Sequence, residues 1–194
     1  MNKERLNELE NIINEFKTAE KKELERDSKF LKFKSYEFKL NNGKTIIREE
    51  LIKGNSNGSA VIIIPRLENG KYLTVIEPRV FTDLTVGIAF PAGYIDKGEE
   101  KEVSALRELR EETGYASNEI EYLDSYYQDE GCSAAMNYMF LAKNCKLESE
   151  QDLDEDEFIK YMDFSLEELL ELEKMGYIKG ANTKFALHKL KYIM

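Results

Sequence analysis

The stretch from Pro91 to Tyr115 constrains this chain more than any other, because it joins a Pro-Ala-Gly turn to an acidic segment with strong helical character. Residues 99–113 consist mostly of Glu, Lys, Ala, Leu and Arg, which favour helices. Gly114 then stands where a helix commonly ends in a left-handed residue, and Asp96 precedes the run in a capping position. The side chains predicted to form an apolar face are Val103, Leu106 and Leu109.

The predicted helix places several carboxylates together. Glu108 and Glu112 are four residues apart and share a face, and Glu111 lies beside them. Carboxylates this close repel one another unless a cation lies between them. An all-oxygen cluster suits a hard divalent ion such as Mg²⁺ or Mn²⁺. Arg107 is spaced to pair with Glu111, and Gly93 would let backbone approach a ligand or metal closely.

An exposed acidic helix is the alternative interpretation, since 34% of the chain is charged. The complete spacing argues against it: Gly93, five residues, Glu99, seven residues, then the segment 107–114, Arg-Glu-Leu-x-Glu-Glu-x-Gly. At average residue frequencies of about 5–7%, such a pattern arises by chance on the order of once in 10⁸ placements. It resembles the Nudix box of the Nudix hydrolase family, apart from Tyr115, where that family usually has an aliphatic residue.

The resemblance implies a fold and a metal site. The Nudix fold is an α/β/α sandwich around a mixed β-sheet. By the same resemblance Glu108, Glu111 and Glu112, together with the Ala92 carbonyl, are expected to hold Mg²⁺ or Mn²⁺. Glu111 and Glu112 are also expected to take part in catalysis. The ions would clamp a diphosphate and activate a water molecule.

Composition limits the other classes of function. The length of 194 residues favours one core-forming domain. The net charge of −10 argues against a nucleic-acid or anionic-membrane surface. We expect neither a membrane span nor a secretory signal, because no apolar run is long enough. Two cysteines, Cys132 and Cys145, do not form a disulfide framework, which favours a cytoplasmic location.

The first 58 residues are predicted to extend a domain formed by residues 59–194. Residues 3–26 form an amphipathic pattern, typical of a helix with Leu6, Leu9, Ile13 and Phe16 on one side. Two strands, 33–41 and 44–52, are joined by an Asn-Asn-Gly turn, and residues 54–58 form a loop. A continuous β-branched run, 61–64, predicts a buried strand, and residues 72–76 a further one.

This order of elements resembles the ADP-ribose pyrophosphatase branch of the Nudix family. In that branch the N-terminal strands build a dimer, so a homodimer is expected. Arg79 lies where those enzymes place an arginine against the substrate phosphates, and Arg66 is a second candidate of the same kind. A surface salt bridge is the alternative role for Arg79.

Two departures leave the substrate open. Ala89 stands where the branch typically has an acidic residue, and the loop 126–132 lacks the proline that the branch tends to carry. Phe90 is expected in the core rather than on a base. Tyr126 and Tyr127 are either a stacking platform or ordinary strand residues.

The acidic segment 148–157 follows two predicted strands, 119–127 and 136–143. By composition it is a solvated loop. In the ADP-ribose pyrophosphatases, an acidic loop before the last strand delivers a general base or a further metal ligand, and the position before residues 158–161 matches. The candidates are Asp154, Glu155, Asp156 and Glu157, of which Asp156 and Glu157 are favoured.

Two helices are predicted to end the chain. Ser165 and Glu168 form a capping-box pattern for a helix that runs to about Met175, and residues 182–192 form the last helix. His188, the single histidine, lies among apolar residues and is given no role. A His-based hydrolase and a His-bound zinc site are therefore disfavoured.

The sequence thus predicts a metal-dependent hydrolase of a nucleoside diphosphate linked to another group. For ADP-ribose the products would be AMP and ribose 5-phosphate. Other nucleotide sugars, dinucleotides and modified nucleoside triphosphates remain alternatives. A Nudix module that binds a nucleotide without cleaving it is disfavoured, because the carboxylates of the box are all present.

Overall fold

The computed structural model describes residues 1–24, 27–54 and 57–193. In these residues the helices are α1 (Lys3–Phe16), α2 (Lys101–Thr113), α3 (Leu166–Met175) and α4 (Ala181–Ile193). The strands are β1 (Leu31–Lys39), β2 (Thr45–Lys53), β3 (Ala60–Leu67), β4 (Tyr72–Pro78), β5 (Val86–Ala89), β6 (Ala92–Tyr94), β7 (Tyr115–Ala116), β8 (Glu119–Tyr127), β9 (Met136–Leu147) and β10 (Lys160–Phe164).

The described strands form two sheets. β1 and β2 pair only with each other, whereas the other eight strands form one sheet with the central order β10-β4-β3-β9-β7. Three strands lie off this path: β5 pairs with β4, β6 with β3, and β8 with β9. β3 and β9 run parallel, and the other neighbours run antiparallel. The prediction of a mixed sheet is confirmed.

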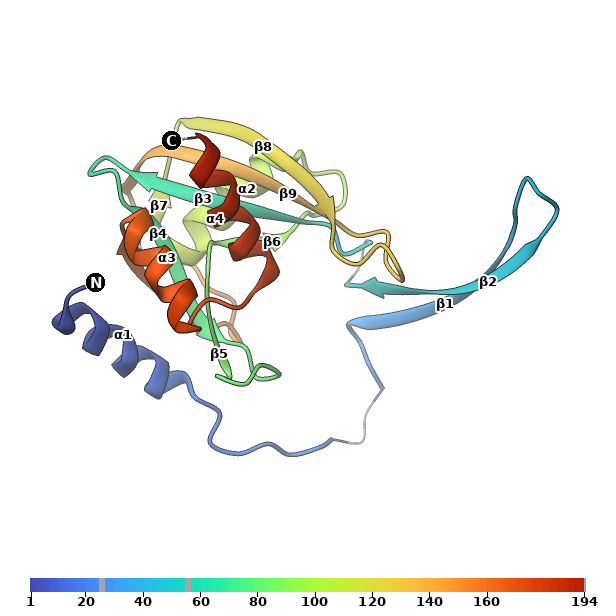
Figure 1. Cartoon of the computed structure of the whole chain (residues 1–194), viewed down its shortest axis with the longest axis horizontal. Helices are drawn as coiled ribbons and strands as arrows, with labels where there is room; N and C mark the ends of the chain where they lie inside the picture. Colours follow the sequence, from blue (N-terminus) through green and yellow to red (C-terminus); the bar gives the residue numbers. More distant parts are fainter. Residues whose placement is uncertain (25–26, 55–56, 194) are drawn as a thin grey trace.

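β3 is buried on both faces because its alternate side chains enter two different cores. Ile62 and Ile64 belong to a cluster with residues of α1, α3 and α4. Val61 and Ile63 belong to a second cluster, with Leu109 of α2. Alternate side chains of a strand point to opposite faces, so helices cover both sides of the sheet. Figure 1 shows the same arrangement, with α3 and α4 in front of the sheet and α2 behind it, and the predicted α/β/α sandwich is confirmed.

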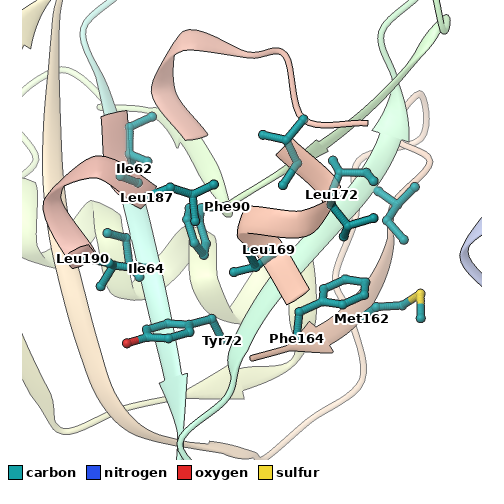
Figure 2. Packing of buried hydrophobic residues seen from close by; sticks show 14 of the residues in the cluster. Ile62, Ile64, Tyr72, Phe90, Met162, Phe164, Leu169, Leu172, Leu187 and Leu190 are labelled. Atoms are coloured by element: carbon teal, nitrogen blue, oxygen red, sulfur yellow. The ribbon is translucent and has the colours of Figure 1, made fainter. Parts of the chain in front are cut away.

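The larger core lies under α3 and α4. Figure 2 shows Leu187 and Leu190 of α4 on the side of β3 that carries Ile62 and Ile64. Phe90 is 2% exposed in this cluster, so its expected place in the core is confirmed. Burying one such side chain contributes roughly 1.5–3 kcal/mol relative to leaving it exposed. The cluster therefore holds the sheet in place beneath the site described below.

α2 is shorter than predicted and is rotated relative to the predicted apolar stripe. It begins at Lys101 after the N-cap residue Glu100, and Asp96 does not cap it. Leu109 is fully buried, but Val103 is 57% exposed, so its predicted place on the apolar face is wrong. Positions three apart drift by about 60° on a helix of 3.6 residues per turn, which separates Val103 from Leu109 by about 120°.

α1 ends ten residues before the predicted boundary at residue 26. It packs on the larger core through Leu9 and Ile13, with Phe16 at its edge. Residues 17–24 are exposed and mostly charged or polar, so they offer no apolar face that would stabilise a longer helix. Residues 25–26 of the predicted helix lie outside the described residues.

The β1–β2 hairpin extends away from the rest of the molecule (Figure 1). Its register runs from Leu31 opposite Lys53 to Lys39 opposite Thr45, one or two residues from the predicted strand ends. Every residue of β1 is exposed, including the apolar side chains of this strand. Of the predicted loop 54–58, Asn55 and Ser56 lie outside the described residues.

The C-terminal elements follow their predictions closely. β8 has the predicted bounds, β9 runs four residues further than predicted, and the last strand lies two to three residues later, at β10. Ser165 and Glu168 form the predicted capping box of α3. His188 is exposed on α4. Each described helix is too short or too polar to span a lipid bilayer.

Replacing Gly114 with alanine should destabilise the protein more than the same change at Gly70. Both residues have positive φ angles, +74° and +81°. A Cβ at position 70 would meet open space, so only the conformational cost of about 1–2 kcal/mol applies. A Cβ at position 114 would overlap the backbone carbonyl of Ser149, which adds roughly 1–3 kcal/mol. Urea unfolding measures both variants, and equal losses would contradict the prediction.

Candidate active site

A cavity of about 880 Å³ lies against α2, β6 and the acidic loop, which we define as residues 148–157. Small-molecule sites usually have volumes of roughly 300–1,000 Å³. Its carboxylates are Glu77, Asp96, Glu108, Glu111, Glu112, Asp152, Asp154 and Glu157. Its basic residues are Lys53, Arg79 and Arg107. The excess of carboxylates means that the cavity attracts cations, and with them the anionic groups that cations bind.

Arg107 holds the exposed side of the carboxylate cluster together. Its Nε and Nη2 donate to the two oxygens of Glu99, each at 3.0 Å. Its Nη1 donates to Glu108 and to Glu111, both at 2.8 Å, so the predicted pairing with Glu111 is present. Through Glu99 the loop before α2 is tied to the helix. One guanidinium group therefore orients three carboxylates.

Glu112 is the most buried carboxylate of the cluster. Its side chain is 6% exposed, and the backbone N–H of Ala92 donates to its Oε2 at 3.2 Å. Burial raises the pKa of Glu112 well above its usual value, and the charges of Glu77 and Glu108 raise it further. A desolvated carboxylate beside two others is stabilised by a cation. The surroundings of Glu112 thus favour a bound metal ion.

Glu108 packs directly against the backbone of Gly93. A Cβ on Gly93 would overlap the carboxylate carbon and both carboxylate oxygens of Glu108. Glycine is therefore the residue that fits between β6 and α2 at this point. Burial raises the pKa of Glu108 to about 7, although the Arg107 charge and hydrogen bond lower it.

The acidic loop is bound to the C-terminal end of α2. The N–H of Asp152 donates to the Glu111 carbonyl at 2.9 Å, and Gln151 Nε2 donates to the Glu112 carbonyl at 2.5 Å. Two further loop N–H groups donate to the Gly114 carbonyl, at 3.0 and 3.2 Å. The last carbonyls of a helix lack partners within it, so the loop satisfies them. These contacts place the loop at the edge of the cavity.

The structure distinguishes the loop candidates for a proton acceptor by whether they line the cavity. Asp154 and Glu157 line the cavity, whereas Glu155 and Asp156 are exposed and lie outside its lining. The backbone N–H of Asp154 donates to Glu157 Oε2 at 3.1 Å, which holds the Glu157 side chain in place. Burial is the largest cause that raises the pKa of Glu77, and the negative charge of Glu157 raises it further.

The two arginine candidates also separate. Arg79 lines the cavity and forms an ion pair with Glu77 at 2.5 Å. Arg66, near the end of β3, lies outside the cavity lining. The Arg79 side chain is 53% exposed, so its guanidinium group has room to reach a ligand.

Several cavity residues were not identified from the sequence. Glu77 precedes Pro78 at the end of β4 and carries no recognisable motif. Burial raises its pKa, and the charge of Arg79 lowers it. The amide and lysine side chains of the lining come from two strands, a helix and the residue after β8, and no local pattern connects them. They are Lys53, Gln128, Asn137 and Asn182.

The donor set fits a hard divalent cation by its chemistry. Carboxylate oxygens are the ligands that Mg²⁺ and Mn²⁺ prefer, and Glu112 is desolvated beside Glu77 and Glu108. Within residues 1–24, 27–54 and 57–193, no group of three or more acidic, thiol or imidazole side chains converges closely enough to hold an ion as the side chains stand. Glu108 and Glu111 are hydrogen-bonded to Arg107 instead.

Comparison with known proteins agrees with this geometry. The model of the NUDIX domain matches residues 56–183. An ADP-ribose pyrophosphatase of Bacillus subtilis (strain 168) is 35% identical over 153 residues, which are 78% of this chain and 80% of that protein. A methanol dehydrogenase activator of Bacillus methanolicus is 33% identical over 153 residues, with the same coverage.

A similar fold occurs among solved structures. The crystal structure of an ADP compounds hydrolase superposes with a TM-score of 0.72 at 24% identity. The match covers 87% of this chain and 89% of that one.

Replacing Gly93 with alanine should reduce turnover by about 100-fold while the protein stays folded. The new methyl group would push the Glu108 carboxylate away from β6, and a displacement of about 1 Å can cost 10²-fold in rate. A side chain can move aside more easily than backbone, so the fold should persist. Gly180→Ala is the matched control, because its Cβ would meet only Thr183 Oγ1 at 4.0 Å. Equal kcat values in the two variants would refute this prediction.

Proposed function

The chain belongs to the NUDIX domain family and is a Nudix hydrolase, and we propose that it cleaves the diphosphate of ADP-ribose to AMP and ribose 5-phosphate with Mg²⁺ as its metal. The observation that carries this proposal is the buried Glu112 beside the partly buried Glu108, both of which line a cavity large enough for a nucleotide sugar. The B. subtilis relative is an ADP-ribose pyrophosphatase, which supports this substrate over other nucleotide sugars.

The metal ligands we propose are Glu108, Glu111, Glu112 and the Ala92 carbonyl. Mn²⁺ has the same ligand preference and is the alternative ion. When bound, the ion supplies charge neutralisation at the diphosphate and acidifies the attacking water. Arg107 orients Glu108 and Glu111 through hydrogen bonds, and the Ala92 N–H orients Glu112 in the same way.

Glu157 is the proton acceptor we propose. It lines the cavity, its side chain is held by the Asp154 N–H, and its loop is hydrogen-bonded to the end of α2. As water attacks phosphorus, Glu157 takes its proton and the bond to the leaving phosphate oxygen breaks. Asp156, favoured equally by sequence position, lies outside the cavity lining and is the less suitable base.

Arg79 is the substrate-binding arginine we propose. Its planar fork suits phosphate oxygens, and its half-exposed guanidinium group has room to contact a phosphate in the cavity. Arg66 lies outside the cavity lining, so this role falls to Arg79 alone.

The function is tested by chromatography after the protein has been incubated with ADP-ribose and Mg²⁺. AMP and ribose 5-phosphate should appear in equal amounts. Glu112→Gln should abolish turnover, because it removes a metal ligand, and Glu157→Gln should reduce it about 10²–10⁴-fold, as expected for a lost general base. Metal removal with a chelator should also stop the reaction.

The matched control for these variants is Glu155→Gln, an identical change in the same loop at an exposed position outside the cavity. It should retain wild-type activity. Cleavage of another nucleotide sugar but not of ADP-ribose would overturn the substrate assignment. Full activity of Glu112→Gln would overturn the metal site, and full activity of Glu157→Gln would move the base to Asp154.

We further propose that residues 1–58 extend the hydrolase domain 59–194 and that the hairpin dimerises it. Phe33 and Ile47 of the hairpin are 71% and 66% exposed, and an exposed apolar face of this kind suits a second copy. The free thiols and the net charge of −10 agree with a cytoplasmic protein that does not bind nucleic acid.

Light scattering should give a mass of twice the 22.6 kDa chain. Charged replacements at Phe33 and Ile47 should shift the protein to the single-chain mass, because burying those charges in an interface is unfavourable. Charge reversals at Lys34 and Arg48, which are exposed on the opposite face of the hairpin, are the control. A single-chain mass for the unmodified protein would refute the dimer.

A further inference from the structure

A chain of hydrogen bonds between amide side chains forms part of the cavity lining. Lys53 Nζ donates to Gln128 Oε1 at 2.7 Å, and Gln128 Nε2 donates to Asn137 Oδ1 at 3.0 Å. Asn137 Nδ2 then donates to Asn182 Oδ1 at 2.8 Å. Lys53 ends β2, Gln128 directly follows β8, Asn137 lies in β9 and Asn182 in α4, and all four line the cavity.

Lys53 determines which atom donates and which accepts along this series of hydrogen bonds. A lysine ammonium group only donates, so the Gln128 oxygen must face Lys53. The Gln128 amide nitrogen also donates to the Gly58 carbonyl, which only accepts, at 2.8 Å. Each amide then imposes its orientation on the next. This resolves the usual ambiguity between the oxygen and nitrogen of an amide side chain.

Asn182 is the last residue of this hydrogen-bonded series, and the N–H groups of its side chain are not used within the series. Its Oδ1 accepts from Asn137 and also from the Tyr126 hydroxyl, at 3.0 Å. Its Nδ2 donates to no group in the part of the chain that the structure describes. Tyr126 is itself held by an edge contact with Phe185, whose ring centroid lies 4.7 Å away. Asn182 therefore presents a rigid N–H donor to a ligand in the cavity.

The position of Asn182 separates it from the proposed reaction centre. It lies in the first turn of α4, on one side of the sheet, whereas α2, which carries the carboxylates, lies on the other side (Figure 1). Lys53, the basic residue of this hydrogen-bonded series, already donates to Gln128. A neutral donor suits a neutral oxygen better than a further phosphate, whose desolvation costs more.

We propose that Asn182 binds a hydroxyl oxygen of the sugar attached to the distal phosphate and thereby selects substrates that carry a polyhydroxylated group there. This inference rests on the proposed function and concerns the half of the substrate that the carboxylate cluster does not address. Asn182 is a specificity residue. Its contact would be the same in the ground state and in the transition state, so it should change KM and not kcat.

The test measures kcat and KM for ADP-ribose with Mg²⁺ in Asn182→Ala, with Asn14→Ala as the control. Asn14 is exposed on α1 and bonds only to Lys17 among the described residues. Loss of one neutral hydrogen bond should raise KM about fivefold to tenfold in Asn182→Ala and leave kcat nearly unchanged. Inhibition by ADP, which lacks the sugar on the distal phosphate, should be unaffected.

Asn182→Asp distinguishes a hydroxyl partner from a phosphate partner. Aspartate can keep the bonds from Asn137 and Tyr126, and its second oxygen can accept a hydroxyl proton. KM should therefore return to within about threefold of the unmodified protein. A KM above that of Asn182→Ala would identify a repelled phosphate and overturn the proposal.

Tyr126→Phe provides a test that leaves Asn182 and its helix intact. It removes one of the two donors that orient Asn182 while the ring contact with Phe185 remains. KM should rise about twofold to threefold. If the unmodified protein cleaves ADP-ribose and Asn182→Ala behaves like Asn14→Ala, this inference fails alone. If the unmodified protein does not cleave ADP-ribose, the proposed function fails with it.

Discussion

The guanidinium group of Arg107 is the interaction on which the acidic site depends. Carboxylates brought together in a partly buried cavity repel one another and lose hydration, and both effects raise their pKa values. Arg107 offsets this by donating to three of them while remaining on the same helix as two. It leaves Glu112 uncompensated, because that residue lies deeper, against β6. The remaining imbalance makes the cavity suitable for a metal ion and makes the metal-free site electrostatically unfavourable.

The packing of α2 transmits this constraint to the rest of the fold. Gly93 allows β6 to approach Glu108, and Gly114 ends the helix with its carbonyl free to accept bonds from the acidic loop. One helix thereby positions the carboxylates at its inner face and the loop at its end. Leu109 anchors it in the smaller core. The catalytic proposal therefore depends on helix packing as much as on the identity of the acidic residues.

The cavity has a second part, lined by neutral amides and one lysine, with different physical requirements. Its amides come from elements far apart in the sequence and are ordered by a lysine on the projecting hairpin. A contact between β2 and the cavity means that the N-terminal extension contributes to the site as well as to the exposed surface. In our proposals, the two chemically unlike halves of the substrate contact different helices, α2 and α4.

Local patterns were sufficient for most of the helix 101–113, which was predicted from residue 99, for the carboxylates on it and for the buried strand β3, because helix periodicity and runs of β-branched residues are properties of neighbouring residues. The α/β/α class came from the resemblance to the Nudix family. Local patterns were insufficient for four other features. Glu157 and Asp156 are adjacent and chemically similar, and only the path of the loop brings Glu157 to the cavity. Arg79 and Arg66 differ likewise in which strand end faces the site. Val103 fits the stripe by spacing yet is exposed, since the sheet covers a narrower arc of the helix. The hydrogen-bonded series that ends at Asn182 depends on β2, β9, α4 and the residue after β8 meeting in space, and contacts between distant segments leave no periodic trace in a single sequence.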